Sequence, residues 1–493
     1  MRAKFVTLIA IAFGAFGCSS DKGSKELSQE KDILADSETA ALEGPESTSP
    51  EAATLDVNWN ALPRLPKDRA FSKAYAAGAA RRKVTPDHSI YMGGFGFCQS
   101  APNLCRKSQG VHDDLWVDVV VIADTKSGEA VALGGIDAIG LLLYDHQLIQ
   151  KGVQQAIYEK YGTYFDGTRI FLGASHSHAA PDTTGLWGLG FGEGRDEKYV
   201  EFLRNQVIEA VVEAYGNLAD VSLFYGQDEL SNDSGDKDTK DYRLLVLQGK
   251  GADGSVLFTL TRWSSHPTAY GSDNKGISAD WVGTFRELMS KEINGLHIYL
   301  QGPIGDVYPN RPNECGLAQE VFPDGYKTPG LSPEAYMKVT CTGLTVVEAA
   351  KRALAKLTPL AETGIEHHYT LFKFHPDNGV LMLLANTTPL PIPQVDASDP
   401  NSLLDTAVGF ARIGDLYFLS APGEAFPTFA KAGEDRLRAK GAQQVFTLGL
   451  TYDWMGYLLT EQQYHDPDFA YHQTLCPGGE LLSKYLAALD SIL

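Results

Sequence analysis

The chain has 493 residues, of which 43% are hydrophobic and 21% are charged, and its formal net charge is -20 at pH 7. This acidity argues against a nucleic-acid partner, because binding to phosphates requires a surplus of Lys and Arg. The length exceeds that of one minimal domain but suits one large α/β unit.

The first seventeen residues predict a secretory signal peptide. Residues 1–4 are positively charged, and the apolar run 5–16 is too short to span a bilayer. The run ends in Gly17-Cys18, which resembles the bacterial lipobox, where the cysteine is lipidated and becomes the new N-terminus. Lipid chains on Cys18 would tether the protein to a membrane surface without a spanning segment; cleavage without lipidation is the alternative. We therefore expect a lipid-anchored protein of the bacterial cell envelope, on its periplasmic or outer-surface side.

Residues 18–57 predict a flexible acidic linker that begins at the lipidated cysteine. This stretch is rich in Ser, Glu, Ala and Lys and has almost no aromatic residues, so it cannot bury enough apolar surface to offset the entropy of ordering. Residues 58–493 then predict one folded body. No second apolar stretch in the chain is long enough to cross a membrane.

Five cysteines remain in the folded body, and an oxidising envelope favours disulfides between them. Cys98 and Cys105 are close in the sequence and are expected to close a small loop. Cys315 with Cys341 is the next pairing, which leaves Cys476 unpaired. None of the five has the spacing of a zinc finger.

Alternation between β-branched apolar runs and helical patterns predicts a mixed α/β fold, with mixed β-sheets flanked by helices. Strands are predicted over residues 116–123, 131–136, 169–174, 242–248, 256–263, 297–301, 381–385, 416–421 and 444–448. Helices are predicted over residues 145–161, 198–215, 346–357 and 427–440. Residues that could carry chemistry repeatedly follow the carboxyl ends of these strands, where loops carry function on a rigid scaffold.

The strongest of these candidates is a pair of histidines after the strand 169–174. His176 and His178 are two positions apart at a strand end, so their side chains are expected on the same face. Two imidazoles on one face suit Zn2+, and Asp182 could orient one ring. Histidine pairs also occur as ordinary polar loop residues, and this pair alone does not decide between the two interpretations.

Four further candidates also follow strands. His266 ends one apolar strand, and Asp306 lies in a tight loop whose glycines permit positive φ. Glu424 follows the strand 416–421, where it could instead cap the next helix. Tyr457 follows the strand 444–448, where it could be a core residue. Spacing alone does not unite these fragments.

Their order along the chain does unite them. Seven fragments follow one another: Tyr91-Met92-Gly93-Gly94; Gly110-Val111-His112; residues 173–178 with Pro181; His266-Pro267-Thr268 with Asp273-Asn274-Lys275-Gly276; Gly305-Asp306-Val307 with Pro309-Asn310; Ala421-Pro422 with Glu424; and Tyr457 with Thr460 and Tyr464. This succession resembles the neutral (alkaline) ceramidase family from the start of the folded body almost to its end. The resemblance implies that residues 58–493 form a single large catalytic domain. In a departure from the longer enzymes of the family, we expect no C-terminal immunoglobulin-like domain.

The resemblance also implies one zinc ion held by four residues, which here are His176, His266, Glu424 and Tyr457. Two neutral imidazoles and one carboxylate leave a Lewis-acidic ion that can also bind water or substrate. The implied reaction is hydrolysis of an amide (or ester) bond by zinc-activated water, with an N-acyl lipid such as ceramide as the substrate. In this reaction we expect His178 to shuttle a proton or hold the tetrahedral intermediate, and Tyr457 to support the oxyanion.

The remaining expected roles concern the substrate pocket. His112 is expected to line the pocket, Asp306 to shape its floor, and Tyr308 to close it or to donate a hydrogen bond. Trp187, together with Phe95, Phe97 and Phe191, could accept an acyl chain or could equally belong to the core.

One departure from the family opens two alternatives. The ceramidases carry a catalytic serine in the tight loop, at the position where this chain has Tyr308. A phenol is larger than a hydroxymethyl group and reaches further from its Cα, so it is not a simple substitute. The alternatives are a zinc esterase or amidase that acts on a non-lipid substrate, and a non-catalytic metal-containing envelope lipoprotein.

Overall fold

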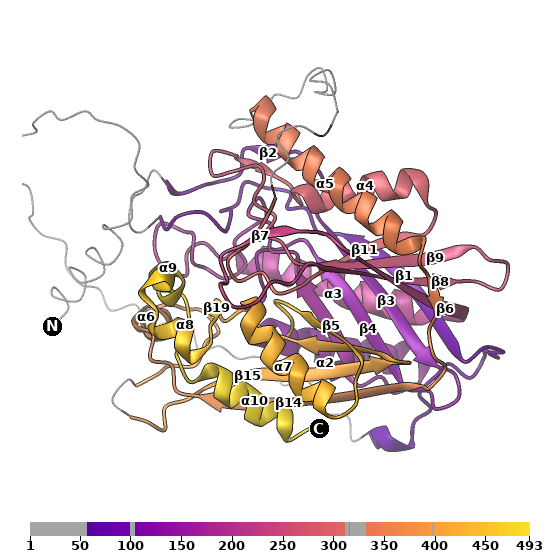
Figure 1. Ribbon diagram of the computed structural model, residues 1–493. Coiled ribbons are helices and arrows are strands. Elements are labelled where there is room, and N and C mark those ends of the chain that lie inside the picture. The colour runs from indigo at the N-terminus through magenta and orange to yellow at the C-terminus, as the bar shows by residue number, and fades with distance from the viewer. Residues whose placement is uncertain (1–56, 99–103, 311–314, 316–331, 397–398) are drawn as a thin grey trace, which may run out of the picture. The chain divides into compact units, whose positions relative to one another are not determined.

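The computed structural model describes residues 57–98, 104–310, 315, 332–396 and 399–493 (Figure 1). The predicted signal peptide 1–17, Cys18 and the predicted linker up to residue 56 lie outside the described residues. The chain divides into two compact units, Met1–Ala61 and Leu62–Leu493. Of the first unit only residues 57–61 are described, and they include the 3-10 helix η1 (Trp59–Ala61).

A nine-stranded mixed sheet forms the larger half of the second unit. Its strands are β1 (Tyr75–Lys83), β3 (Trp116–Asp124), β4 (Ala130–Ile136), β5 (Ile170–Ala174), β6 (Ala219–Glu229), β8 (Arg243–Lys250), β9 (Val256–Trp263), β11 (Leu296–Gln301) and β13 (Thr358–Pro359). They follow the order β11-β9-β8-β6-β1-β3-β4-β5, with β13 paired to β6. The pairs β4–β5 and β9–β11 are parallel, and the other pairs are antiparallel.

This sheet curls until its two ends approach each other. A Cβ atom on Gly135 of β4 would lie 2.1 Å from the carbonyl oxygen of Tyr299 in β11, so only glycine permits this approach. The curl brings the carboxyl end of β5 close to that of β9, although 89 positions separate Ala174 from Trp263. The loops after these two strands carry the predicted histidines.

A second sheet packs on the first. It contains β14 (Ile365–Phe374), β15 (Leu404–Ile413), β16 (Leu416–Ser420) and β18 (Gln444–Leu448), in that order. One buried apolar cluster includes Leu133 and Phe171 of the first sheet and Phe418 and Phe446 of the second. Burial of such side chains contributes about 1.5–3 kcal/mol each, so this interface holds the two sheets together.

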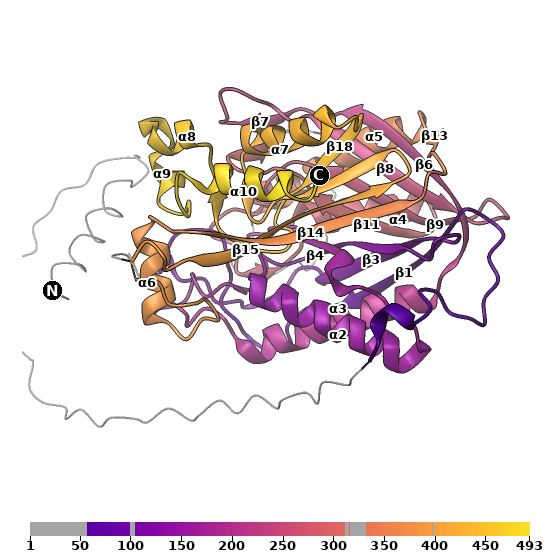
Figure 2. The same ribbon diagram turned by 90° about the horizontal axis from the view of Figure 1, so that it is seen from below.

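Helices cover both outer faces of the paired sheets. Figure 2 shows α2 and α3 on one side and α7 and α10 on the other. The helices of the described residues are α2 (Leu143–Tyr161), α3 (Glu197–Gly216), α4 (Trp281–Glu292), α5 (Pro333–Leu354), α6 (Gly379–Thr387), α7 (Pro427–Ala439), α8 (Glu461–His465), α9 (Ala470–Gln473) and α10 (Leu481–Asp490), with the 3-10 helices η3 (Gly167–Arg169) and η5 (Pro467–Phe469). Three short pairs complete the fold: β2 (Gly110–Val111) with β10 (Gly276–Ile277), β7 (Asn232–Ser234) with β12 (Val307–Pro309), and β17 (Glu424–Ala425) with β19 (Tyr457–Leu458).

The predicted mixed α/β fold is confirmed, with two corrections to individual elements. The predicted strand 381–385 is wrong, because these residues lie in α6. Leu, Met and Ala are strong helix formers, and a short apolar run of them does not distinguish a helix from a strand. The predicted helix 346–357 is the last part of α5, which begins at Pro333 and ends at Leu354. Among the described residues, no helix combines the length and apolar character needed to cross a bilayer.

Candidate metal centre

The candidate centre lies where the two sheets meet at the carboxyl ends of their strands. His176 follows β5, His266 follows β9, and Glu424 begins β17, which comes after β16 of the second sheet. His176 has φ +66°, a left-handed conformation that histidine adopts more readily than most residues. The sequence suggested that strand alternation would place the two predicted histidines together, but it does not. The turn at His176 does so instead, and the ring centroids of His176 and His178 lie 4.9 Å apart.

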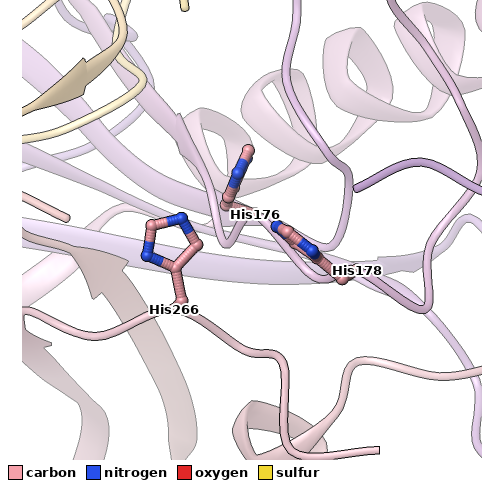
Figure 3. Close-up of side chains that lie close together, drawn as sticks. All are labelled: His176, His178 and His266. Atoms are coloured by element: carbon pink, nitrogen blue, oxygen red, sulfur yellow. The ribbon is translucent and has the colours of Figure 1, made fainter. Parts of the chain in front are cut away.

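Three imidazoles converge at this point (Figure 3). The ring of His266 lies 5.1 Å from that of His176 and 5.5 Å from that of His178. One nitrogen of each ring lies within 4.8 Å of the others, a spacing that could hold a metal ion. His176 and His266 are fully buried and His178 is 9% exposed, so the cluster is enclosed by protein.

Glu424 joins two of the three histidines. Its Oε2 lies 3.3 Å from Nε2 of His176 and 3.2 Å from Nε2 of His266. Its other oxygen, Oε1, accepts a hydrogen bond of 3.1 Å from the indole N–H of Trp454. Burial alone would raise the pKa of Glu424, but His176 and His266 outweigh this effect and hold the pKa well below its ordinary value of 4.5. Glu424 is therefore a carboxylate with one oxygen directed at two imidazoles.

The hydrogen bonds of Nδ1 in His176 and His266 show which atoms of the two rings are left to face Glu424. Nδ1 of His176 lies 2.5 Å from the carbonyl oxygen of Ile139, and Nδ1 of His266 lies 2.8 Å from that of Val307. A carbonyl oxygen only accepts, so both Nδ1 atoms donate. In a protonated ring Nε2–H donates to the carboxylate, which is the contact that lowers the pKa of Glu424; in a neutral ring Nε2 instead carries a lone pair that a cation can bind. Three lone-pair atoms that face one another fit a shared cation, and backbone carbonyls commonly fix metal-binding imidazoles in this way.

His178 differs from its two neighbours. Neither of its ring nitrogens has a hydrogen-bond partner among the described residues, and Phe95 packs against its ring at a centroid distance of 4.7 Å. Burial, together with His176 and His266, lowers the pKa of His178 well below 6.5. The ring therefore holds a proton less readily than a free imidazole, and both of its nitrogens remain open to a molecule placed beside them.

Tyr457 lies opposite Glu424 in the short parallel pair β17–β19. Its side chain is 5% exposed, and His472 packs against its ring at 4.6 Å. Burial and the neighbouring Glu424 raise the pKa of Tyr457 well above 10. The side chains of Tyr457, His176, His178 and Glu424 line one small cavity of about 20 Å3, which is room for roughly one water-sized group.

The other predicted site residues differ in whether they reach this cavity. The ring of Tyr308 stacks on His266 at 5.0 Å and an interplanar angle of 22°. Trp187 lines the cavity, whereas Asp306 faces Nε2 of His472 at 3.5 Å. His112 does not line the cavity, and its Nε2 is 2.7 Å from Oδ1 of Asn274.

Sequence reasoning missed three residues that the structure places at the site. Trp454 contacts Glu424 through its indole N–H, Tyr471 lines the small cavity, and His472 contacts both Tyr457 and Asp306. Trp454 belongs to the fragment Thr451 to Tyr457 that follows β18, so its place after a strand was a usable signal. Nothing in the sequence distinguishes the other two residues, because they come from the short helix α9.

Two disulfides occur among the described residues. Cys98 pairs with Cys105, and Cys315 pairs with Cys341, while Cys476 is free and buried. The first disulfide closes the loop that follows Phe97, a residue that lines the small cavity.

Comparisons with known proteins point to one group. A scan against protein-family models found no match. The neutral ceramidase of Pseudomonas aeruginosa is 23% identical over 267 residues, which is 49% of this chain and 38% of that enzyme. The neutral ceramidase of Drosophila pseudoobscura pseudoobscura is 21% identical over 295 residues, 52% of this chain and 40% of that enzyme. These matches thus span about two fifths of the length of the curated relatives.

Solved structures show the same likeness at the level of the fold. The crystal structure of the Pseudomonas aeruginosa neutral ceramidase superimposes with a TM-score of 0.67 at 18% identity, covering 85% of this chain and 74% of that one. A ceramidase complexed with C2 gives the same TM-score at 17% identity, covering 85% and 75% of the two chains. The chain thus has the fold of the neutral ceramidases and is similar to them in sequence, which confirms the resemblance that its seven ordered fragments predict.

Proposed function

We propose that this protein is a metal-dependent hydrolase that cleaves the amide bond of an N-acyl lipid such as ceramide. One observation carries the proposal: Nε2 of His176 and Nε2 of His266 both face the same oxygen of Glu424, while their Nδ1 atoms are committed to carbonyl groups. The similarity to neutral ceramidases in sequence and fold supports the choice of an amide as the substrate.

These donor atoms fit Zn2+ better than a hard cation. Zn2+ prefers imidazole and carboxylate ligands, whereas Mg2+ and Ca2+ prefer sites made of oxygen. His176, His266 and Glu424 would hold the ion, with Tyr457 beside Glu424 as the fourth candidate. Bound there, Zn2+ supplies Lewis acidity towards the scissile carbonyl and towards a water molecule.

The side chains around the centre have different roles in the proposed reaction. His178 is buried and its ring nitrogens have no partner among the described residues, so it is the group placed to take a proton from the attacking water and to return it to the leaving amine. Tyr457, buried beside Glu424 on β19, would support the developing oxyanion through its hydroxyl when it is not bound to the ion. Trp454 holds Glu424 in orientation through its N–H group.

Tyr308 bears on the choice of substrate. The ring of Tyr308 stacks on His266, at the position where the resemblance places the serine of the ceramidases. Two alternatives therefore stand beside the hydrolysis of ceramide. The protein could be a zinc esterase or amidase that acts on a non-lipid substrate, or a metal-containing envelope lipoprotein without catalysis. We further propose that a lipid on Cys18 keeps the protein on a bacterial envelope membrane, close to a lipid substrate.

Elemental analysis of the purified protein, paired with a screen of N-acyl and O-acyl substrates, tests this proposal. We expect about one zinc ion per chain, turnover of N-acyl amides, loss of turnover with a chelator and recovery on adding Zn2+. His176→Ala should lose both zinc and turnover, while His88→Ala, at a half-exposed surface histidine, should keep both. Full zinc content in His176→Ala would overturn the site, and bound zinc without turnover of any amide or ester would favour the non-catalytic alternative.

A further inference from the structure

Gln301 joins the two loops that carry the proposed histidine ligands. It is the last residue of β11 and is 1% exposed. Its Nε2 donates hydrogen bonds to the carbonyl oxygens of Ser175, at 2.7 Å, and of Ser265, at 2.9 Å. These serines directly precede His176 and His266, whose side chains come from two separate segments of the chain (Figure 3). One buried amide therefore contacts the backbone beside both ligands.

The partners of Gln301 require a neutral amide. The two carbonyl oxygens take up both N–H groups of Nε2, and Oε1 accepts a hydrogen bond of 3.3 Å from the backbone N–H of Ser265. Oε1 also lies 2.9 Å from the hydroxyl oxygen of Tyr299. A carboxylate would present only acceptors to the two carbonyl groups, and a cationic side chain would present only donors to the N–H group. A terminal amide supplies both kinds of group at once, and glutamine is the longer of the two amide side chains.

The position of Gln301 in the first sheet explains why it reaches both loops. β11 and β5 stand at the two ends of the strand order, and Tyr299 of β11 lies against Gly135 of β4 where the sheet curls. On its other side β11 pairs with β9, where Gln301 lies opposite Trp263 at the carboxyl ends of both strands. The side chain of Gln301 therefore spans from the loop after β9 to the loop after β5, across the two ends of the curled sheet.

The two loops are joined both before and after the ligands. Gln301 joins them just before His176 and His266, and the backbone N–H of His178 donates to the carbonyl oxygen of Pro267 just after them, at 3.1 Å. The second contact is between backbone atoms and does not depend on the identity of a side chain. Gln301 is therefore the contact that a substitution can remove without changing a ligand.

We propose that Gln301 is a positioning residue of the candidate metal centre, and that its amide sets the separation at which His176 and His266 share a metal ion. The centroids of these two rings lie 5.1 Å apart. This inference rests on the proposed metal-dependent function, and it adds a determinant of metal affinity outside the ligand set. Residues that orient metal ligands through hydrogen bonds commonly change the affinity for the metal when they are substituted.

The affinity of the full chain for Zn2+, measured by competition with a chelating dye, tests the inference. Gln301→Met keeps the length of the side chain without its hydrogen-bonding groups, and the Kd for Zn2+ should rise by about tenfold or more. The visible absorption of protein loaded with Co2+, which reports the geometry of the ligands, should shift in the same variant. An unchanged Kd and an unchanged Co2+ spectrum would overturn the inference. Gln301→Asn keeps the amide but withdraws it by one methylene, and the same two measurements on this variant decide the question should Gln301→Met fail to fold.

Gln248→Met provides the matched control. Gln248 is a second buried glutamine of the first sheet, 3% exposed, and its Nε2 donates to the hydroxyl of Thr259 on the neighbouring strand at 3.0 Å. This variant also replaces a buried amide with methionine, but it should keep the Kd for Zn2+ and the Co2+ spectrum of the wild type. Equal weakening of zinc binding in Gln248→Met and Gln301→Met would indicate a general loosening of the fold and would refute the positioning role.

Turnover of N-acyl amides, measured on the same samples, separates this inference from the proposed function. If Gln301→Met weakens zinc binding but the wild type hydrolyses no amide, the hydrolase function fails and the positioning role stands. If the wild type hydrolyses amides and Gln301→Met binds zinc as tightly as the wild type, the positioning role fails and the function stands. A wild-type protein that binds no zinc would overturn both.

Discussion

Zinc binding should stabilise the folded protein, and Glu424→Gln should remove most of that stabilisation. In the structure Oε2 of Glu424 lies 3.2–3.3 Å from two imidazole nitrogens that both carry lone pairs when neutral. When a cation binds, the direct contacts between Oε2 of Glu424 and the two imidazole nitrogens are replaced by a bond from each of these three atoms to the cation. Glutamine keeps the size of the side chain, and its amide can donate to one imidazole, so the variant is expected to fold without metal.

The size of the effect follows from linkage. At a free Zn2+ concentration of 100 times Kd, binding to the folded state alone contributes about 2.7 kcal/mol. The compact unit Leu62–Leu493 has about 430 residues, which gives an unfolding entropy of about 0.9 kcal/mol per kelvin near the Tm. The Tm should therefore rise by about 3 °C in the wild type.

Calorimetry of protein from which a chelator has removed the metal, with and without added Zn2+, measures this shift. Glu424→Gln should show less than about a third of it at the same Zn2+ concentration, because a charged ligand is lost. Glu159→Gln, an exposed glutamate on α2, serves as the control and should shift like the wild type. An equal shift in Glu424→Gln would show that the ion binds elsewhere and would refute the reasoning.

Three further outcomes can be measured independently. Trp454→Phe removes the hydrogen bond to Oε1 of Glu424 and should weaken zinc binding by about 10–100-fold in calorimetric titration. Gly94→Ala forces a side chain into a backbone with φ +106° and places its Cβ 2.2 Å from Cγ of His178, so urea unfolding should show a loss of about 1–3 kcal/mol. Burial raises the pKa of Asp113 from 3.8 to about 7, so its contribution to stability is fully present below about pH 4 and is lost as the pH rises towards 7. Asp113→Asn should remove up to about 4 kcal/mol of this pH dependence.

Each of the last two predictions has a matched control. Gly254→Ala places the same side chain at φ +80° with no other atom within 4 Å, so any excess loss in Gly94→Ala measures the contact with the histidine ring. Asp114→Asn changes the half-exposed neighbour of Asp113 and should leave the slope of stability against pH as it is in the wild type. A slope that stays unchanged in Asp113→Asn would contradict the role of its burial.

The sequence predicted the fold class and most strands of the first sheet, because buried strands such as β3 are continuous β-branched runs. It did not predict β1 or β6. The central Ala and Gly residues of β1 carry no strand signal, and their burial is decided by α3, whose Ala214 carbonyl oxygen would lie 2.1 Å from a Cβ on Gly78. Tertiary packing overrides local propensity in such strands.

For the candidate site as well, the sequence predicted one part and not the other. The ordered fragments brought forward His176, His266, Glu424 and Tyr457, and the structure places them together. The contacts that orient them could not be predicted, because they join backbone atoms far apart in the sequence, such as Nδ1 of His176 with the carbonyl oxygen of Ile139. The same is true of the curl of the first sheet, which follows from strand pairing and not from any local pattern.

The pairing of Glu424 with Tyr457 in β17–β19 also constrains the order of events during synthesis. Glu424 and His266 are 158 positions apart, and β17 acquires its partner strand only when residues 457–458 have left the ribosome. The four candidate ligands therefore cannot all meet on a nascent chain that ends before Tyr457. A centre with all four ligands would therefore form late in synthesis, and a product truncated before Tyr457 would lack the fourth ligand.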